Sequence, residues 1–427
     1  MNILLIQPPS HNPIVDQVYL FEPLALEYLG AGAQQEGHRV RILDARLDPD
    51  IEGCLREYQP DVVGMTAFTS HVNIVKHIAA TVRRLYPQVI LIIGGHHATV
   101  GPEDFNDGAF DLVVIGEGVV ALKEILGEAA GSQDFRKIRG LAIPDPGGMH
   151  FTPERPYTPL DELPIPDRSL TAAYRPNYFS EWLKPLASIR TSLGCTARCT
   201  FCALWKITGG KYLRRDPSAV VEELKGIVEE NVFFCDDESM CDTRRMDELA
   251  DLIRIAGIRK RYFLYARVDT ISRHPELFAK WADIGLSEVF VGMEDFSNER
   301  MAAMKKGVTT GQQAEAARIL RDLGIVMYAS FMVDPDYSRE DFRALTAYVR
   351  KLRLTYATFT VMTPLPGTEL QASRRQEISS DKPELYDLLH ALLPTRLPLP
   401  EFYEELAKLY AGAVPLYRSL PTLLPYG

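Results

Sequence analysis

Residues 186–202 read LASIRTSLGCTARCTFC, a short apolar strand followed by a turn and three closely spaced cysteines. Cys195, Cys199 and Cys202 form a CxxxCxxC pattern, and the aromatic Phe201 directly precedes the last cysteine. Three thiolates on one loop are typical of an iron–sulfur cluster, whose irons are bound by cysteine sulfur. Three protein ligands leave one iron of a cubane cluster open for a substrate or cofactor.

Two other interpretations of these cysteines remain. A zinc site requires a fourth ligand in a tetrahedral arrangement, and the nearest histidines, His150 and His274, are distant in the sequence. Free cysteines also pack in cores as small apolar residues, which is the interpretation that we give to Cys54, Cys235 and Cys241.

Downstream of the motif, short apolar strands alternate with helices up to residue 370. Strands separated by helices, without internal alternation of polar and apolar residues, form parallel sheets. Six strands predict a partial (β/α)6 TIM-like barrel over residues 186–370 rather than the usual eight-stranded one. The expected strands are Ala187–Arg190, Val232–Cys235, Tyr262–Ala266, Glu288–Val291, Val326–Met332 and Thr358–Met362, with helices at Ser218–Glu229, Met246–Ile255, Pro275–Ala282, Gly311–Leu323 and Glu340–Leu352.

Upstream, residues 1–125 show the same alternation, which predicts an N-terminal doubly wound α/β domain with a parallel sheet. Residues 126–185 are rich in proline and are expected to be a linker, and residues 371–427 are expected to form a short helical C-terminal cap. The expected N-terminal strands are Asn2–Ile6, Val40–Leu43, Val62–Met65, Val89–Ile93 and Leu112–Ile115, with helices at Leu24–Gln35, Glu52–Tyr58 and Val72–Leu85.

The composition narrows the function classes. The 427 residues include 47 Lys and Arg against 57 Asp and Glu, a net charge of −10 that argues against a nucleic-acid partner. The N-terminus does not resemble a signal peptide. The sequence contains no run of about 18 apolar residues, so we expect no membrane span. Six sparse cysteines favour a reducing, cytoplasmic location.

The CxxxCxFC motif after the first strand of a partial barrel resembles the radical S-adenosylmethionine (SAM) superfamily, over about residues 186–370. The resemblance implies that Cys195, Cys199 and Cys202 hold a [4Fe–4S] cluster, whose open iron chelates the amine and carboxylate of SAM. It also implies that one electron, from an external donor of flavodoxin or ferredoxin type, cleaves the sulfonium to a 5′-deoxyadenosyl radical.

Further segments at the ends of expected strands resemble the SAM contacts of that superfamily. They are FCDDE after the second strand, ARVD after the third, GME after the fourth and TPLPGT after the sixth. A carboxylate at a strand end is also common as a helix N-cap or an ion-pair partner. The SAM-binding residues that the resemblance implies are Phe201, Asp236, Asp237, Glu238, Arg267, Glu294 and Pro364.

An open parallel sheet binds ligands beyond the carboxyl ends of its strands, and no GxGxxG follows the first strand to indicate a dinucleotide. Residues 1–125, with their GGHHAT and VIGEG segments, resemble the cobalamin-binding domain that precedes many radical SAM modules. The alternative is a degenerate domain that only packs on the barrel. The resemblance implies that the cobalamin-binding residues are Pro8, Pro9, Thr66, Thr69, Ser70, Gly94, Gly95, His96, Gly116, Glu117 and Gly118.

The chain departs from the fuller cobalamin-binding pattern, DxHxxG, whose histidine ligates cobalt. QPPSHN stands in its place from Gln7 to Asn12, which puts histidine ligation in doubt more than cobalamin binding. His11, His71, His96 and His97 equally fit ordinary hydrogen bonding in turns.

Together these features predict a cobalamin-dependent radical SAM enzyme that methylates an unactivated carbon. The alternatives are a non-methylating radical reaction (cyclisation, rearrangement or oxidation), a tRNA methylthiotransferase, and a cobalamin carrier or sensor without catalysis. The Leu-, Tyr- and Pro-rich segment 385–421 resembles the tails of subfamily members acting on isoprenoid or tetrapyrrole substrates, so we expect a small-molecule or lipid-like substrate. An ordinary helical lid fits that segment equally well.

Overall fold

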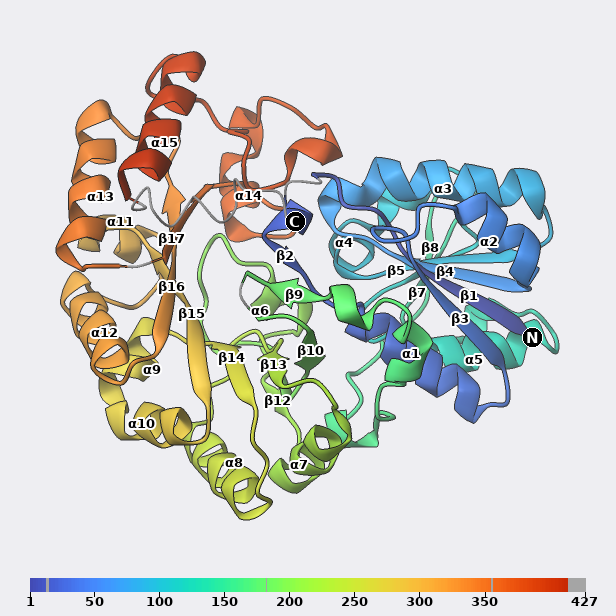
Figure 1. Ribbon diagram of the computed structural model, residues 1–427. Helices are drawn as coiled ribbons and strands as arrows, with labels where there is room; N and C mark the ends of the chain where they lie inside the picture. The colour runs from blue at the N-terminus through green and yellow to red at the C-terminus, as the bar shows by residue number, and fades with distance from the viewer. Residues whose placement is uncertain (13–14, 182, 355, 414–427) are drawn as a thin grey trace.

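A computed structural model describes residues 1–12, 15–181, 183–354 and 356–413 of the chain. It contains two α/β units, each built on its own sheet, that lie side by side (Figure 1). This is the predicted fold class: a doubly wound N-terminal domain followed by a six-stranded partial barrel.

The N-terminal sheet has helices on both faces. Its apolar strands are buried on both sides, with α2 and α3 above the sheet and α1 and α5 below it in Figure 1. The parallel strands run in the order β3-β1-β4-β5-β6. Their bounds are β1 Asn2–Gln7, β3 Arg39–Asp44, β4 Val62–Thr66, β5 Ile90–Gly94 and β6 Leu112–Val114, and the helices are α1 Leu24–Gln35, α2 Ile51–Tyr58, α3 Val72–Leu85, α4 His96–Val100 and α5 Val119–Ala129.

The expected linker contributes strands to the first sheet and to a separate two-stranded sheet. β7 (Leu141–Ile143) and β8 (His150–Phe151) extend the first sheet in antiparallel fashion, and β9 (Phe179–Ser180) pairs with β2 (Tyr19–Leu20). Prolines exclude helices here, but they tolerate short strands at a sheet edge. The first sheet therefore reaches beyond the boundary that we expected at residue 125.

The barrel sheet is parallel and its strands follow chain order, β10-β13-β14-β15-β16-β17. Its helices pack on the outer face in one large core, as expected for successive βα units. All six predicted strands and all five predicted helices are present. The bounds are β10 Leu186–Ile189, β13 Asn231–Phe234, β14 Arg261–Tyr265, β15 Leu286–Glu294, β16 Val326–Val333 and β17 Tyr356–Val361, with α7 Pro217–Gly226, α8 Thr243–Ile255, α10 Pro275–Asp283, α12 Thr310–Asp322 and α13 Arg339–Lys351.

The C-terminal segment contains α14 (Glu369–Arg374) and α15 (Leu399–Ala413), and Phe402 of α15 packs edge-on against Phe342 of α13. The rest of the expected cap, residues 414–427, lies outside the described residues. No helix within the described part of the chain is long and apolar enough to cross a membrane.

Buried ion pairs join the two units through the linker. The Arg175 guanidinium donates to Glu22, just before α1, at 2.6 Å and to Glu229, after α7, at 2.5 Å. Arg168 similarly donates to Glu223 of α7 at 2.7 Å. Breaking such pairs leaves uncompensated buried charges, so this network ties the linker to the segment before α1 on one side and to α7 and the turn after it on the other.

Candidate active site

The three cysteines lie on the loop after β10, where a tight turn starts the loop. Gly194 has φ +93°, and a Cβ at this position would lie 2.1 Å from the Lys211 carbonyl oxygen. Only glycine accommodates both the backbone angle and this approach. The short strands β11 (Ser192–Leu193) and β12 (Leu213–Arg214) pair across the base of the loop.

The thiols of the loop share one neighbourhood. Cys202 interacts electrostatically with Cys195 and Cys199, and both of these interact with Arg267. Burial raises the pKa of the Cys202 thiol to about 11 and also raises that of Cys195. Metal binding deprotonates such thiols outright, so the donor set fits a cluster that holds thiolates near a cationic side chain.

Within the described residues, no three His, Cys, Asp or Glu side chains gather around a point where a single metal ion fits. A cubane cluster spaces its cysteine sulfurs more widely than one ion does, because its own irons lie between them.

Asp236 and Asp237, both expected at SAM, hold the cluster loop by its backbone. Asp236 is fully buried, and its carboxylate accepts from the N–H groups of Thr191 and Ser192 at 2.6 and 2.8 Å. The Asp237 carboxylate accepts from Gly194 N–H at 2.6 Å, and its side chain lines the first-domain cavity described below. Asp236 is thus saturated within the protein.

Glu238 interacts electrostatically with Cys195, as Asp237 does with Cys202. Only 3% of Glu238 is exposed, and burial raises the pKa of its carboxyl to about 7. Its one backbone partner is Arg267 N–H at 3.4 Å, a long hydrogen bond. The Cys241 thiol is a further hydrogen-bond partner of this carboxyl. A buried carboxyl whose partners are one long N–H bond and a thiol, a weak donor, is suited to an amine-bearing ligand.

Arg267 and Glu294 are both hydrogen-bonded to Lys306, a residue that the sequence analysis did not indicate. The Arg267 guanidinium donates to the Lys306 carbonyl oxygen at 2.8 Å, and the Lys306 ammonium donates to the Glu294 carboxylate. Glu294 has φ +63°, and both it and Lys306 are buried. No motif marks Lys306, because it follows a short helix, Asn298–Ala303, far from the cysteines in sequence.

The two apolar candidates lie on segments joined by a hydrogen bond. Pro364 is buried in the turn after β17, and Phe201 is half-buried in the cluster loop. Leu370 N–H, at the start of α14, donates to Thr200 carbonyl oxygen at 2.9 Å. The turn after the last strand thus lies against the cysteine loop.

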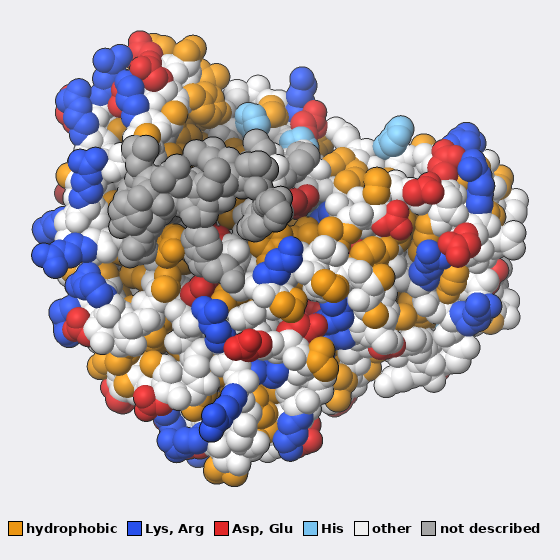
Figure 2. Space-filling view, in the orientation of Figure 1, with side chains coloured by type: hydrophobic (Ala, Val, Ile, Leu, Met, Phe, Trp, Pro, Cys, Tyr) orange, Lys and Arg blue, Asp and Glu red, His pale blue; other side chains and the backbone are white. Residues whose placement is uncertain are grey.

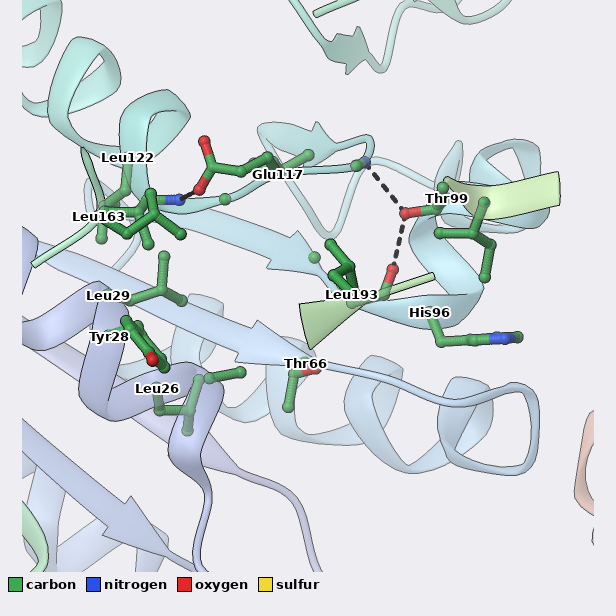
Figure 3. Close-up of a pocket in the computed structure, with 18 of the residues that line it drawn as sticks. Leu26, Tyr28, Leu29, Thr66, His96, Thr99, Glu117, Leu122, Leu163 and Leu193 are labelled. Carbon is green, nitrogen blue, oxygen red and sulfur yellow. Dashed lines mark hydrogen bonds between the residues drawn. The ribbon is translucent and has the colours of Figure 1, made fainter. Parts of the chain in front are cut away.

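A cavity of about 330 Å³ lies between the first sheet and the cluster loop. Figure 3 shows Leu26, Tyr28 and Leu29 of α1 at one side of it and Thr66 at a strand end. Residues after β10, among them Arg190 and Leu193, also line it, so the carboxyl edges of both sheets meet here. Such a mostly apolar pocket with few polar groups is typical of a cofactor site.

Most of the cobalamin candidates lie at this cavity. The residues that line it are Thr66, Gly94, Gly95, His96, Gly116, Glu117 and Gly118. Pro8, Pro9, Thr69 and Ser70 are not among its lining residues. Gly95, with φ +95°, has no room for a side chain, because a Cβ would lie 2.3 Å from the Thr66 hydroxyl.

The histidines near this edge have separate roles. His97 is buried and contacts Thr69 Oγ1 at 3.1 Å through Nδ1 and Asp104 at 2.8 Å through Nε2, so neither ring nitrogen remains for cobalt. Burial lowers the pKa of His96 to about 4, which leaves it neutral, and its ring points away from the leucines in Figure 3.

Sequence reasoning missed the residues that the barrel contributes to the cavity. The short helix α6 (Leu204–Ile207) follows the cysteine motif directly in the chain. The cavity is lined by Leu204 and Ile207 of this helix and by Thr208, the next residue. Tyr157 of the linker also lines it and donates to the Ile207 carbonyl oxygen at 2.9 Å. The sequence feature that could have indicated them is the pair of apolar residues, Leu204 and Ile207, that follows Cys202.

Two protein-family models match the chain: a B12 binding domain over residues 15–126 and the radical SAM superfamily over residues 189–349. The hopanoid C-3 methylase of Methylococcus capsulatus is 32% identical over 422 residues, which are 96% of this chain and 79% of that protein. The bacteriochlorophyllide d C-8(2)-methyltransferase of Chlorobaculum tepidum is 25% identical over 83% of this chain and 77% of its own length.

Among solved structures, the radical SAM methyltransferase TsrM from Kitasatospora setae, with cobalamin and a [4Fe–4S] cluster bound, has the same fold. The TM-score is 0.77 at 20% identity, with 97% of this chain and 91% of TsrM covered. A B12-binding domain followed by a radical SAM domain defines the class of enzyme. The chain belongs to the cobalamin-dependent radical SAM methyltransferases, with cobalamin, a [4Fe–4S] cluster and SAM as cofactors.

Proposed function

We propose that this enzyme methylates an unactivated carbon of a small, apolar substrate of isoprenoid or tetrapyrrole type. The observation that carries the proposal is the shared wall between the two cofactor regions. Leu204 and Ile207 of α6 line the first-domain cavity, and the loop that leads into α6 bears the three cysteines. A methyl donor in the cavity and a cluster on the loop are therefore neighbours.

When bound, the cluster and SAM supply the radical that abstracts a hydrogen atom, and cobalamin supplies the methyl group. A general base cannot remove a proton from such a carbon at useful rates. We assign Cys195, Cys199 and Cys202 to the cluster. Asp236 orients the loop that carries them.

We assign the charged residues at the barrel edge to the polar end of SAM. Glu238 would accept from an amine, and Arg267 would donate to a carboxylate, with Lys306 and Glu294 fixing the position of Arg267. Phe201 and Pro364 remain our candidates for its apolar contacts. The strand-end glycines Gly94, Gly116 and Gly118 would let the corrin tail approach the backbone closely.

An aromatic wall on the concave face of the barrel sheet supports an apolar substrate. The rings contact one another from strand to strand, with ring centroids 4.8 Å apart for Phe233 and Phe263, 4.9 Å for Tyr265 and Phe290, and 5.8 Å for Phe290 and Tyr328. They lie on the face opposite the helix-packed core. We define the wall as Phe233, Phe263, Tyr265, Phe290, Tyr328 and Tyr356.

The named relatives support the same substrate class, because one is a hopanoid methylase and another a bacteriochlorophyllide methyltransferase. We further propose that a flavodoxin or ferredoxin delivers the electron that SAM cleavage requires. We place the enzyme in the reducing cytoplasm, because all six cysteines are free thiols.

The test incubates anaerobically reconstituted enzyme, SAM and reductant with a lipid extract and, separately, with polar metabolites. We expect a lipid product heavier by one CH₂, with S-adenosylhomocysteine and 5′-deoxyadenosine formed in equal amounts. A methylated polar product would refute the substrate class.

A second candidate, a non-methylating radical reaction, is favoured by relatives that are named as cyclases. The anaerobic magnesium-protoporphyrin IX monomethyl ester cyclase of Cereibacter sphaeroides is 25% identical over 88% of this chain and 64% of its own length. Formation of 5′-deoxyadenosine with little S-adenosylhomocysteine would select this alternative.

A further inference from the structure

We propose that the outer face of the cluster loop and α6 is the docking surface for an acidic, one-electron carrier protein, a flavodoxin in the first instance. This inference rests on the proposed function, because reductive cleavage of SAM needs one electron per event and none of the chain's own groups provides it. The surface consists of Arg198, Trp205, Lys206 and Lys211.

The charge of this segment is opposite to that of the whole chain. Residues 196–215 contain five Lys and Arg and no Asp or Glu, although the chain carries −10 overall. Arg214 pairs with Asp242 and Arg215 with Glu223. The other three, Arg198, Lys206 and Lys211, are exposed and have no carboxylate within ion-pair distance among the described residues.

On the face shown in Figure 2, acidic and basic side chains are interspersed. Near the loop, Lys305 illustrates the usual arrangement, since it is paired with Glu369 at 2.8 Å. A patch of unpaired positive charge attracts an acidic partner and accelerates encounter without adding much affinity per charge.

Trp205 joins this surface to a cluster ligand. Its indole N–H donates to the Cys199 carbonyl oxygen at 3.1 Å, and its ring lies 4.9 Å from the Arg198 guanidinium and 5.6 Å from the Lys206 ammonium. Half-buried Trp beside Arg is typical of the energetically dominant residues of interfaces. A partner seated on Trp205 is therefore next to the backbone of a cluster cysteine.

The same short helix also reaches the cobalamin cavity. Leu204 and Ile207 of α6 face the cavity, while Trp205 and Lys206 belong to the outer surface. The redox step transfers one electron and no atoms: the anionic flavin hydroquinone of the carrier becomes its neutral semiquinone, and the [4Fe–4S] cluster passes from the 2+ to the 1+ state.

The experiment compares holoenzyme with the Lys206→Glu/Lys211→Glu and Lys206→Gln/Lys211→Gln variants, using a purified acidic flavodoxin as the probe. The matched control is Arg259→Glu/Lys351→Glu. Both of its residues are exposed, and they precede β14 and β17, at the barrel edge opposite the cysteines. The readouts are the dissociation constant at low and at moderate ionic strength and the rate of semiquinone formation.

We expect the Glu variant to weaken flavodoxin binding at low salt about tenfold or more, the Gln variant to weaken it less, and both to flatten the salt dependence. SAM cleavage driven by dithionite should remain as in the wild type, and the control should bind flavodoxin within about twofold. Equal binding by all four proteins would overturn the proposal, as would a patch that binds an RNA oligonucleotide but not flavodoxin.

The two proposals fail separately. Charge-dependent flavodoxin binding without any methylated product would remove the proposed function and leave the docking surface. Dithionite-driven methylation together with flavodoxin binding that ignores the patch would do the reverse.

Discussion

The two halves of the site differ in how they are prepared for their ligands. The first-domain cavity is lined mainly by leucines and strand-end glycines, such as Leu29, Leu122 and Gly94. The barrel edge is lined by buried charges, among them Glu238, Arg267 and Lys306. One half offers shape and apolar surface. The other offers buried charges, of which Arg267 is paired with Asp269 and Lys306 with Glu294, while Glu238 has no cationic ion-pair partner among the described residues.

This difference indicates how each half binds. Apolar burial is non-directional and follows the area removed from water, so the cavity should select its ligand by fit. Buried charges are costly without partners, and burial raises the pKa of Glu238 to about 7. The amine of a ligand such as SAM would give Glu238 the cationic partner that it lacks, so the barrel edge should select by charge.

The largest expected effect comes from a substitution that should disable the barrel half of the site and leave the cobalamin cavity intact. Cys199→Ala removes one of three thiolates, and we expect the loss of most cluster iron and a fall in SAM cleavage of about 1000-fold or more. Corrin retention should change little, because the cavity does not use the thiol. Iron analysis and visible spectra measure both, with Cys54→Ala, buried on α2, as the control. Loss of corrin together with the cluster would show that the halves do not form independently.

Filling the cavity is the converse experiment. Gly94 ends β5, and a Cβ there would meet only Val114 at 3.7 Å, so Gly94→Leu is tolerated by the backbone while its branch enters the cavity. We expect corrin affinity to fall about 100-fold, near 3 kcal/mol, with cluster content unchanged. Equilibrium dialysis with hydroxocobalamin measures the affinity. Gly127→Leu, exposed on α5 with no atom within 4 Å of its Cβ, is the matched control. Undiminished corrin binding would place the cofactor elsewhere.

The sequence predicted the repeating parts of the molecule well. Apolar runs at strand and helix spacing identified the barrel elements, because each βα unit buries its own faces against its neighbours. The cysteine motif could be recognised for a related reason, because its three cysteines lie close together in the chain. Local patterns are sufficient wherever the chemistry is local.

Contacts between distant segments were not predictable. Leu204 and Ile207 belong to the barrel but line the cavity of the first domain, and Lys306 joins Arg267 to Glu294 from a loop without a motif. Asp236 fits the SAM-contact pattern, yet its oxygens bind the loop backbone and hydroxyl. No local pattern distinguishes a carboxylate that holds a loop from one that faces a ligand.

The interface that fixes the two halves together gives the third prediction. Glu27 of α1 is fully buried beside Glu22, and burial followed by that neighbour raises the pKa of Glu27 to about 8. The folded protein then holds a proton that the unfolded chain releases above about pH 4.5, so stability falls as pH rises from there to about 8.

Glu27→Gln removes this dependence. We expect the variant to gain about 2 kcal/mol over the wild type at about pH 9 and almost nothing at about pH 4. Urea unfolding at the two pH values measures it, with Glu57→Gln, whose side chain is 70% exposed, as the control. A variant less stable than the wild type at high pH would mean that Glu27 is ionised and paired with Arg168 and Arg175.

The smallest expected effect tests whether the acceptor substrate binds against the aromatic wall of the barrel. Phe290 of β15 lies in the aromatic wall between Tyr265 and Tyr328. Phe290→Leu keeps an apolar side chain but loses the ring contacts, which are worth about 1 kcal/mol. We expect KM for the lipid acceptor to rise about fivefold while SAM cleavage is unchanged. Phe359→Leu is the matched control on the opposite, helix-packed face of β17, where it should lower stability without changing KM. If both variants leave KM unchanged, the acceptor does not lie on the wall, and apolar selection in this enzyme is confined to the cobalamin cavity.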